Sequence, residues 1–392
     1  MAVSLVYDPR MALYRFGAGH PMLPERFTLA IELMDAWDFL GETVGRAETV
    51  PPEPATNQDL LRVHSAAYIQ AVRDERGSSF ADESHGLGFG DTPRFPQMHG
   101  VSALIAGGTC RALDGVVGGE WTRAFNPAGG LHHAHRDRAA GFCVYNDCAV
   151  AIARATACEP GLRVAYVDID AHHGDGVQEV FSARNDVLTC SVHESGRYLY
   201  PGTGAARDIG TGSGAGAAIN VPLPPHAGPG EYQLVFDRVI APALEAFAPD
   251  VIVAQLGADA HRDDPLAHLA LTVEGYRPLV ARLVSLADRL CDGRLAATGG
   301  GGYDAFSATP RMWACAMAAL LGVAPPVELP DAWLARCRAA AVDAGFPPPA
   351  ASSTYDERPA TEPAVPADET RRLTMHSIEQ VRAASPLLST DG

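Results

Sequence analysis

The stretch Val164–Gly176, which reads VAYVDIDAHHGDG, decides the fold of this chain and points to its chemistry. Its first residues are apolar, which is typical of a buried strand, and three acids and two histidines follow. Side chains alternate along an extended chain, so Asp168, Asp170 and His172 share one face. The alternative, a solvated loop at a sheet edge, is disfavoured because five titratable groups there need pairing or solvation. Asp170 and His172 are therefore predicted to bind zinc or another first-row metal.

A second polar cluster, Asn126–His135, reads NPAGGLHHAH and also follows a predicted strand. Two adjacent histidines are weak evidence of function by themselves. The glycines before His132 and His133 strengthen that evidence, because they allow the backbone to approach a buried site closely. His135 is followed by the charged residues 136–138, and we expect it at the surface.

A third cluster lies in Val251–Pro265, where the apolar run VIVAQL continues into GADAHRDDP. Asp259 is the natural third ligand beside the aspartate and histidine of the first cluster. Three protein ligands leave a fourth metal position open for water, which is the pattern of catalytic sites. We interpret Asp263 and Asp264 as part of a turn or helix start before the proline.

The fourth cluster, Ala297–Tyr303, reads ATGGGGY. A phosphate-binding loop would need lysine followed by serine or threonine, and neither occurs, so nucleotide binding is not expected. The glycines instead predict a closely approaching loop that presents the Tyr303 hydroxyl, and a phenol is a good donor to a developing oxyanion. The alternative is an ordinary surface aromatic.

Short apolar runs alternate with longer helical stretches along the chain. This alternation predicts an α/β fold, an open parallel sheet with helices on both faces. Ligands bind beyond the carboxyl ends of the strands in such sheets, where all four clusters would meet. The predicted strands are Ser4–Tyr7, Trp121–Phe125, Arg163–Asp168, Val187–Val192, Ala218–Leu223, Asp250–Leu256 and Arg294–Thr298. The predicted helices are Arg26–Phe39, Asn57–Arg73, Gly100–Gly115, Asn146–Thr156, Gly230–Phe247, Thr272–Leu290 and Ala308–Leu321.

Composition bounds the class of protein. The chain has 392 residues, of which 47% are apolar and 20% charged, enough for a sizeable core. Its formal net charge of −17 argues against nucleic-acid binding, and all 30 basic residues are arginine. We find neither an apolar run of membrane-spanning length nor a signal peptide. Eight scattered cysteines without a CxxC pair predict reduced thiols in a cytoplasmic protein.

Residues 1–345 are predicted to form a single large catalytic domain. The stretch 346–369 is rich in proline and alanine and has few apolar side chains, which predicts a linker. Within the C-terminal tail, 346–392, one short helix is expected over 371–384.

The four clusters, in this order, resemble the histone deacetylase superfamily, which has the arginase/deacetylase fold. The closest resemblance is to its bacterial acetoin utilization branch, AcuC. The matching segments, over about residues 17–303, are HPMLPERF, PAGGLHHAHRDRAAGFCVYND, YVDIDAHHGDGV, ESGRYLYPGTG, INVPLP, QLGAD and GGGGY. The resemblance implies a metal-dependent amide hydrolase that removes acetyl groups from lysine side chains and releases acetate.

The resemblance also implies roles for single residues. The implied metal ligands, for zinc or alternatively ferrous iron, are Asp170, His172 and Asp259. The implied catalytic residues are His133 as general base and acid, Asp175 as its orienting carboxylate, His132 with its partner Asp168, and Tyr303 as the group that polarises the scissile carbonyl.

The implied substrate channel comprises Gly141, Phe142, Tyr200, Leu266, the rim aspartate Asp91, and Arg26 beneath the catalytic pocket. Tyr200 stands where the family usually has phenylalanine, which keeps the channel aromatic and adds a hydroxyl. A potassium ion is implied at Asp168, Asp170, His172, Ser191 and Val192, in part through main-chain oxygens.

Other functions compete with this one. A two-manganese ureohydrolase of the same fold needs further bridging ligands and leaves the histidine pair and Tyr303 without a role. A non-catalytic acyl-lysine binding module predicts the loss of a catalytic group, and none is lost. Polyamine deacetylation would use the same machinery. The expected partners are acetylated metabolic enzymes, such as acetyl-CoA synthetase, rather than a histone, nucleic acid or membrane.

Overall fold

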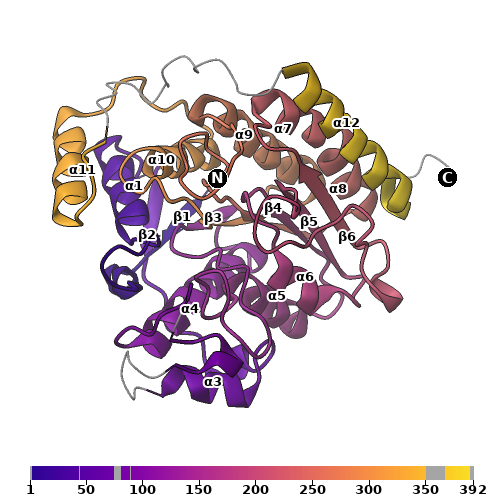
Figure 1. The fold of residues 1–392 in the computed structure, drawn as a ribbon, viewed down its shortest axis with the longest axis horizontal. Coiled ribbons are helices and arrows are strands. Elements are labelled where there is room, and N and C mark those ends of the chain that lie inside the picture. Colours follow the sequence, from indigo (N-terminus) through magenta and orange to yellow (C-terminus); the bar gives the residue numbers. More distant parts are fainter. Residues whose placement is uncertain (1, 44, 75–80, 89, 350–366, 389–392) are drawn as a thin grey trace.

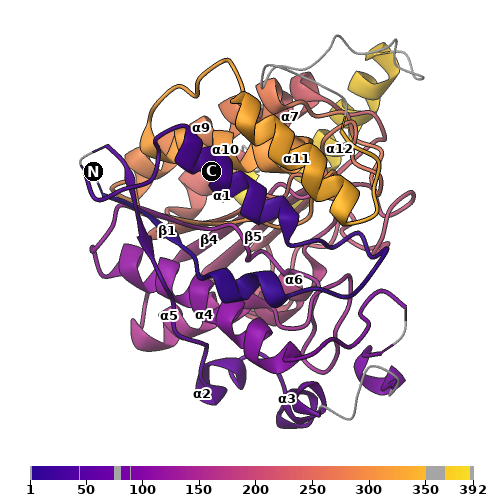
Figure 2. The same ribbon diagram turned by 90° about the vertical axis from the view of Figure 1, so that its left-hand side faces the viewer.

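The computed structural model describes residues 2–43, 45–74, 81–88, 90–349 and 367–388 (Figure 1). In this part of the chain, eight strands form one parallel sheet in the order β2-β1-β3-β8-β7-β4-β5-β6. Helices α4, α5 and α6 lie on one side of the sheet, and α1, α9 and α10 lie on the other (Figure 1 and Figure 2). The predicted α/β fold, a parallel sheet covered on both faces, is confirmed.

The strands are β1 (Val3–Val6), β2 (Ala47–Val50), β3 (Arg123–Asn126), β4 (Val164–Asp168), β5 (Val187–Glu194), β6 (Ala218–Leu223), β7 (Val251–Gln255) and β8 (Leu295–Thr298). The α-helices are α1 (Glu25–Ala36), α2 (Asn57–Leu60), α3 (Ala66–Arg73), α4 (Met98–Val117), α5 (Asp147–Cys158), α6 (Asp175–Phe181), α7 (Pro229–Val235), α8 (Ala241–Phe247), α9 (Val273–Leu290), α10 (Ala308–Leu321), α11 (Asp331–Asp343) and α12 (Ala367–Ala384).

The last residues of four adjacent central strands stand in one row. Asn126 of β3 pairs with Thr298 of β8, Thr298 pairs with Gln255 of β7, and Gln255 pairs with Asp168 of β4. All four strands are buried along their whole length, as their apolar sequences predict. The loops that carry the four polar clusters therefore leave the sheet side by side at its carboxyl edge.

Two predicted helices are interrupted in the structure. The stretch Asn57–Arg73 divides into α2 and α3, because Ser65 caps a new helix by accepting the backbone N–H of Tyr68. The predicted helix Gly230–Phe247 divides into α7 and α8, and the π-helix Phe236–Ile240 lies between them. Pro242 follows at the start of α8 and cannot donate a helical hydrogen bond, so the chain locally takes the wider π spacing.

Helix α12 lies against the edge strand β6, near the C-terminus of the chain (Figure 1). It begins at Ala367, four residues before the helix expected over 371–384. Ile378 and Val381 are buried, and Ser377 Oγ donates a hydrogen bond to the Pro222 carbonyl oxygen at 2.6 Å. The helix thus covers a strand edge that would otherwise offer unpaired backbone groups. Most of the predicted linker, residues 350–366, lies outside the described residues.

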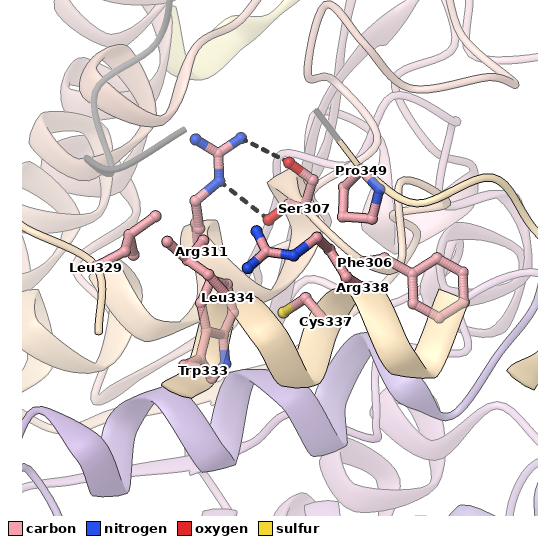
Figure 3. Close-up of a pocket in the computed structure, with 9 residues that line it drawn as sticks. All are labelled: Phe306, Ser307, Arg311, Leu329, Trp333, Leu334, Cys337, Arg338 and Pro349. Atoms are coloured by element: carbon pink, nitrogen blue, oxygen red, sulfur yellow. Dashed lines mark hydrogen bonds between the residues drawn. The ribbon is translucent and has the colours of Figure 1, made fainter. Parts of the chain in front are cut away.

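A small pocket between α10 and α11 has a volume of about 20 Å³ (Figure 3). Arg311 lies in its wall and donates from Nε to the Ser307 carbonyl oxygen at 3.0 Å and from Nη2 to Ser307 Oγ at 3.2 Å. A cavity of this size holds about one water molecule, so it is no substrate site.

All eight cysteines are free, and seven are buried, whereas Cys158 at the end of α5 is exposed. Among the described helices, none combines the length and the apolar character that crossing a bilayer requires.

Candidate active site

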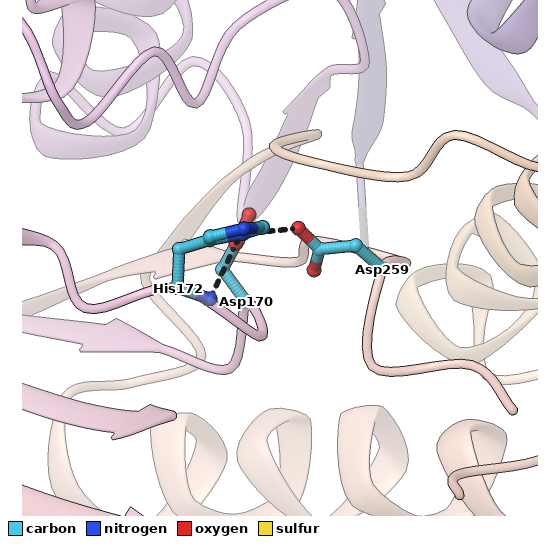
Figure 4. A group of neighbouring side chains, drawn as sticks. All are labelled: Asp170, His172 and Asp259. Carbon is cyan, nitrogen blue, oxygen red and sulfur yellow. Dashed lines mark hydrogen bonds and ion pairs between the residues drawn. The ribbon is translucent and has the colours of Figure 1, made fainter. Parts of the chain in front are cut away.

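Three predicted metal ligands converge from two loops (Figure 4). Asp170 and His172 follow β4, and Asp259 follows β7. His172 Nδ1 lies 2.8 Å from Asp259 Oδ2 and 3.1 Å from Asp170 Oδ1. All three side chains are buried, and one ligand atom from each lies within 4.8 Å of the others.

Asp170, His172 and Asp259 form a candidate metal-binding group that fits a divalent cation. Burial and the neighbouring Asp170 charge raise the pKa of Asp259 to about 7, so two buried carboxylates repel each other unless a cation lies between them. Two carboxylate oxygens and one imidazole nitrogen are a donor set for a first-row metal. The second oxygen of Asp170 accepts hydrogen bonds from Gln255 Nε2 at 2.8 Å and from the Gly301 N–H at 2.6 Å. Such bonds hold a metal-binding carboxylate in its orientation.

The two adjacent histidines each bind their own carboxylate. His132 Nδ1 lies 2.8 Å from Asp168 Oδ2, and His133 Nδ1 lies 2.7 Å from Asp175 Oδ1. Both rings are buried, and their centroids are 4.1 Å apart. Because each Nδ1 faces an acceptor, the Nε2 atoms point toward the site, where they lie 3.1 Å from each other.

The surroundings shift the pKa values of these two histidines in opposite directions. Burial alone would lower the pKa of His132, but the charges of Asp168 and Asp170 outweigh it and raise that pKa to about 9. Burial and the charge of His132 lower the pKa of His133 to about 4. At neutral pH His132 is therefore a cation, and His133 is a neutral imidazole that can accept a proton.

Aromatic rings stand around the metal-binding group. The ring of Tyr200 lies 5.1 Å from that of His133, and the ring of Tyr303 lies 5.6 Å from that of Phe142 and 6.4 Å from that of His172. Burial raises the pKa of Tyr303 well above its usual value, so its phenol stays protonated and can donate a hydrogen bond.

The remaining channel residues lie at the rim and beneath the site. Asp91 is exposed, and its Oδ2 accepts the Gly141 N–H at 2.8 Å. Gly141 has a φ of +53°, and a Cβ there would collide with the ring of His133. Arg26 is buried and donates from Nη1 to the Gly300 carbonyl oxygen at 2.6 Å. Leu266 is half-buried in the loop after β7.

The residues expected at a potassium ion lie beside the metal-binding group. Ser191 and Val192 are buried in β5, and Ser191 pairs in register with Asp168. The Asp168 carboxylate also accepts the hydroxyl of Tyr166 at 2.7 Å and the Asp170 N–H at 3.1 Å.

Comparisons with known proteins agree with this geometry. Residues 20–320 match the histone deacetylase domain. The chain belongs to the histone deacetylase family. It is 40% identical over 334 residues to the acetoin utilization protein AcuC of Bacillus subtilis, covering 84% of this chain and 85% of that protein. It is 36% identical over 335 residues to AcuC of Staphylococcus xylosus, with 84% and 86% covered. As a member of the family it is a deacetylase, a hydrolase of a generally metal-dependent group.

In this deacetylase, one residue of the second cluster is less exposed than the sequence suggested. His135 was expected at the surface, but its side chain is only 12% exposed and lies against α6, near Asp175 and Glu179. Its backbone N–H donates to the Arg138 carbonyl oxygen at 2.9 Å, and this turn directs the ring toward the helix. The charged residues that follow His135 suggested exposure, because the sequence does not show that α6 packs there.

The sequence analysis underrated two further side chains of this deacetylase. Gln255, quoted only within a motif, binds Asp170 from the last position of β7. Asp264 was interpreted as a turn residue, yet it is buried and accepts two backbone N–H groups, from Leu266 and Tyr303. Its position within an acidic run before a proline gave no sign of the partner in another loop.

Proposed function

We propose that this deacetylase removes acetyl groups from lysine side chains of proteins, with a zinc ion held by Asp170, His172 and Asp259. The observation that supports it best is that a neutral imidazole, His133, and a protonated phenol, Tyr303, both lie next to the His172 ring, at centroid distances of 5.7 Å and 6.4 Å. Amide hydrolysis needs a base for the attacking water and a donor for the carbonyl oxygen, and these two groups are suited to those roles.

When bound, the metal ion supplies Lewis-acid activation of water and of the acyl carbonyl. His133 Nε2 takes one proton from the water as its oxygen forms a bond to the amide carbon. The carbonyl oxygen becomes negative, and the Tyr303 hydroxyl donates a hydrogen bond to it. When the carbon–nitrogen bond breaks, His133 returns the proton to the leaving amine, which gives acetate and a free lysine side chain.

The channel supports a long, apolar substrate stem. The rings of Phe142 and Tyr200 flank the site and suit the methylene groups of acetyl-lysine. The exposed Asp91 would accept a backbone N–H of the substrate. Acetylated metabolic enzymes, with acetyl-CoA synthetase as the example, are the proposed partners in the cytoplasm, because the relatives are named for acetoin utilization. A potassium ion at Asp168, Asp170, His172, Ser191 and Val192 belongs to the same proposal.

A single metal site also favours the deacetylase over the two-manganese alternative. Among the described residues, Asp170, His172 and Asp259 are the one group with the geometry of a metal site. Asp263, which could join Asp259 at a second metal ion, is exposed. The histidine pair has its own carboxylate partners rather than a shared second ion.

The test is hydrolysis by metal-stripped protein reloaded with zinc, ferrous iron or manganese. We expect zinc, or ferrous iron, to restore acetate release from an acetyl-lysine peptide and from acetylated acetyl-CoA synthetase. Acetylated polyamines and arginine serve as competing substrates. Preference for an acetylated polyamine would overturn the protein substrate, and release of urea from arginine with manganese alone would overturn the reaction.

A further inference from the structure

A groove with a volume of about 880 Å³ lies between α12 and the loop that joins β5 to β6. Loop residues within 195–208 line one side, and residues 222–224 at the carboxyl end of β6 also line it. Helix α12 contributes one helix face through Leu373, His376, Ser377 and Gln380. The match to the histone deacetylase domain ends at residue 320, so this wall of the groove comes from a segment outside that domain.

The groove and the proposed substrate channel share one loop. Tyr198 lines the groove, whereas the ring of Tyr200 lies 5.1 Å from that of His133 in the candidate active site. Tyr198 is 59% exposed and Tyr200 is 45% exposed. Residues two apart in a chain lie at most about 7 Å from each other. A peptide whose acetyl-lysine enters the channel can therefore reach the groove within a few residues.

Positive charge dominates the lining of the groove. Its charged side chains are Arg197, Arg207 and Asp208, and His376 lies on the α12 wall. Asp208 has a local partner, because its Oδ2 accepts the Ala205 N–H at 3.0 Å. Within the described part of the chain, neither arginine has an acidic partner, and both are exposed. The chain as a whole has a formal net charge of −17, so the groove differs in sign from the protein around it.

The residue types in the groove favour a protein partner. Tyrosine and arginine are enriched among the residues that carry most of the binding energy of protein interfaces. An acidic partner is repelled by the acidic protein as a whole and attracted at the groove, which also orients it. We propose that the groove binds an acidic segment of the acetylated protein substrate, a few residues from the acetyl-lysine in the channel. This inference rests on the proposed function and deepens it, because a polyamine is a cation that the two arginines would repel.

The first test compares two acetyl-lysine peptides of equal length, one with glutamates and one with glutamines at the flanking positions. We expect the zinc-loaded wild type to give about a fivefold higher kcat/KM for the acidic peptide, mainly through KM, and added salt should reduce this ratio. Arg197→Glu and Arg207→Glu should each abolish the preference. Arg372→Glu is the matched control, because it makes the same charge change at an exposed residue of α12 outside the groove, and it should keep the preference.

The ratio of the two kcat/KM values is measured on one preparation, so it does not depend on the fraction of a variant that is folded. Equal values for the two peptides in the wild type would overturn the inference. A preference that persists unchanged in both Arg197→Glu and Arg207→Glu would do the same. An equal loss in Arg372→Glu would attribute the preference to net charge rather than to the groove, and would also overturn the inference.

A binding measurement separates this inference from the proposed function. Fluorescence anisotropy with Tyr303→Phe, in which turnover should be slow, should give a lower Kd for a dye-labelled acidic peptide than for the neutral one. Adding Arg197→Glu should remove this difference. A wild type that hydrolyses no acetyl-lysine peptide, while the binding difference remains, would overturn the proposed reaction and not the groove.

Two other occupants of the groove are outcomes of the same experiments. Calorimetry with inorganic pyrophosphate tests a small anion, and sedimentation of the wild type and of Arg197→Glu tests a second copy of the chain. Tighter binding of pyrophosphate than of the acidic peptide, or a dimer that Arg197→Glu dissociates, would assign the groove to one of these and overturn the inference.

Discussion

Asp264 joins the two loops that flank the metal-binding group by accepting the Tyr303 N–H at Oδ2, at a distance of 2.7 Å. Its other oxygen accepts the Leu266 N–H at 2.9 Å, so one buried carboxylate fixes both the phenol and the wall of the channel. Asp264 binds the backbone N–H of Tyr303, so the Tyr303 hydroxyl remains free for the proposed reaction.

Substitution of Asp264 by Asn should misplace that phenol. The amide offers only one acceptor oxygen, so one backbone N–H loses its partner at about 1–2 kcal/mol, which corresponds to roughly tenfold in kcat. We expect KM and bound metal to change little, as measured by steady-state kinetics and metal analysis. Asp263→Asn, next to it and exposed, is the control and should retain full activity. Equal kcat values in the two variants would contradict the role of Asp264.

Substitution of Tyr303 by Phe removes the proposed oxyanion donor and keeps the ring. We expect kcat to fall about 10²–10³-fold, which is the scale of one such donor. Bound metal and the melting temperature should stay near the wild-type values, because the ring contacts with Phe142 and His172 remain. A loss of less than fivefold would remove Tyr303 from the reaction.

The pH dependence of the wild type should reflect the lowered pKa of His133. The base acts in its neutral form, so activity is lost when pH falls through its pKa, and that pKa is about 4 rather than 6.5. We therefore expect kcat/KM to hold well below pH 6.5 on its acidic limb. Bound metal, measured at each pH, must stay constant for the comparison. An acidic limb at 6.5 or above would contradict the lowered pKa.

Gly141→Ala should inactivate the protein through contact rather than through backbone strain alone. The added Cβ collides with the His133 ring, and the φ of +53° is unfavourable for alanine by about 1 kcal/mol. Gly119→Ala is the matched control, since Gly119 has a φ of +73° and an added Cβ meets nothing within 4 Å. Both variants should lose stability in thermal unfolding, and only Gly141→Ala should lose activity. Comparable activity in both would show that His133 tolerates the contact.

Asp259→Asn should lower the amount of bound metal and relieve the repulsion in the empty site. Metal analysis should give well below one ion per chain, because a charged ligand is lost. The metal-free variant should unfold at a temperature no lower than the metal-free wild type, since one of two buried like charges is removed. Full metal loading of Asp259→Asn would argue against its role as a ligand.

The fold and the meeting of the four clusters could be predicted because both follow from local sequence. Apolar runs of strand length that lead into polar or glycine-rich clusters mark buried strands with polar carboxyl ends. Parallel pairing then brings Asn126, Thr298, Gln255 and Asp168 into one row. The short edge strand β2 was missed, because only one of its four residues is fully buried and its sequence, AETV, has no apolar run.

The partners of single side chains could not be predicted, because they depend on contacts between distant segments. Asp264 and Tyr303 are 39 residues apart, and His135 and Glu179 are 44 residues apart. A turn signal before a proline and a run of charged residues describe the local backbone correctly. Neither pattern shows which loop or helix packs against that backbone.

Cys158 is the one exposed thiol among the eight cysteines, and it lies away from the candidate active site. Asn146, which caps α5, donates from Nδ2 to the His132 carbonyl oxygen at 3.1 Å, so the helix starts beside the two adjacent histidines. Its 12 residues carry Cys158 roughly 18 Å away. The other seven thiols are buried, and the chain has no lysine side chain that could react with the reagent instead. A maleimide-linked dye or support should therefore attach at one place, away from the candidate active site.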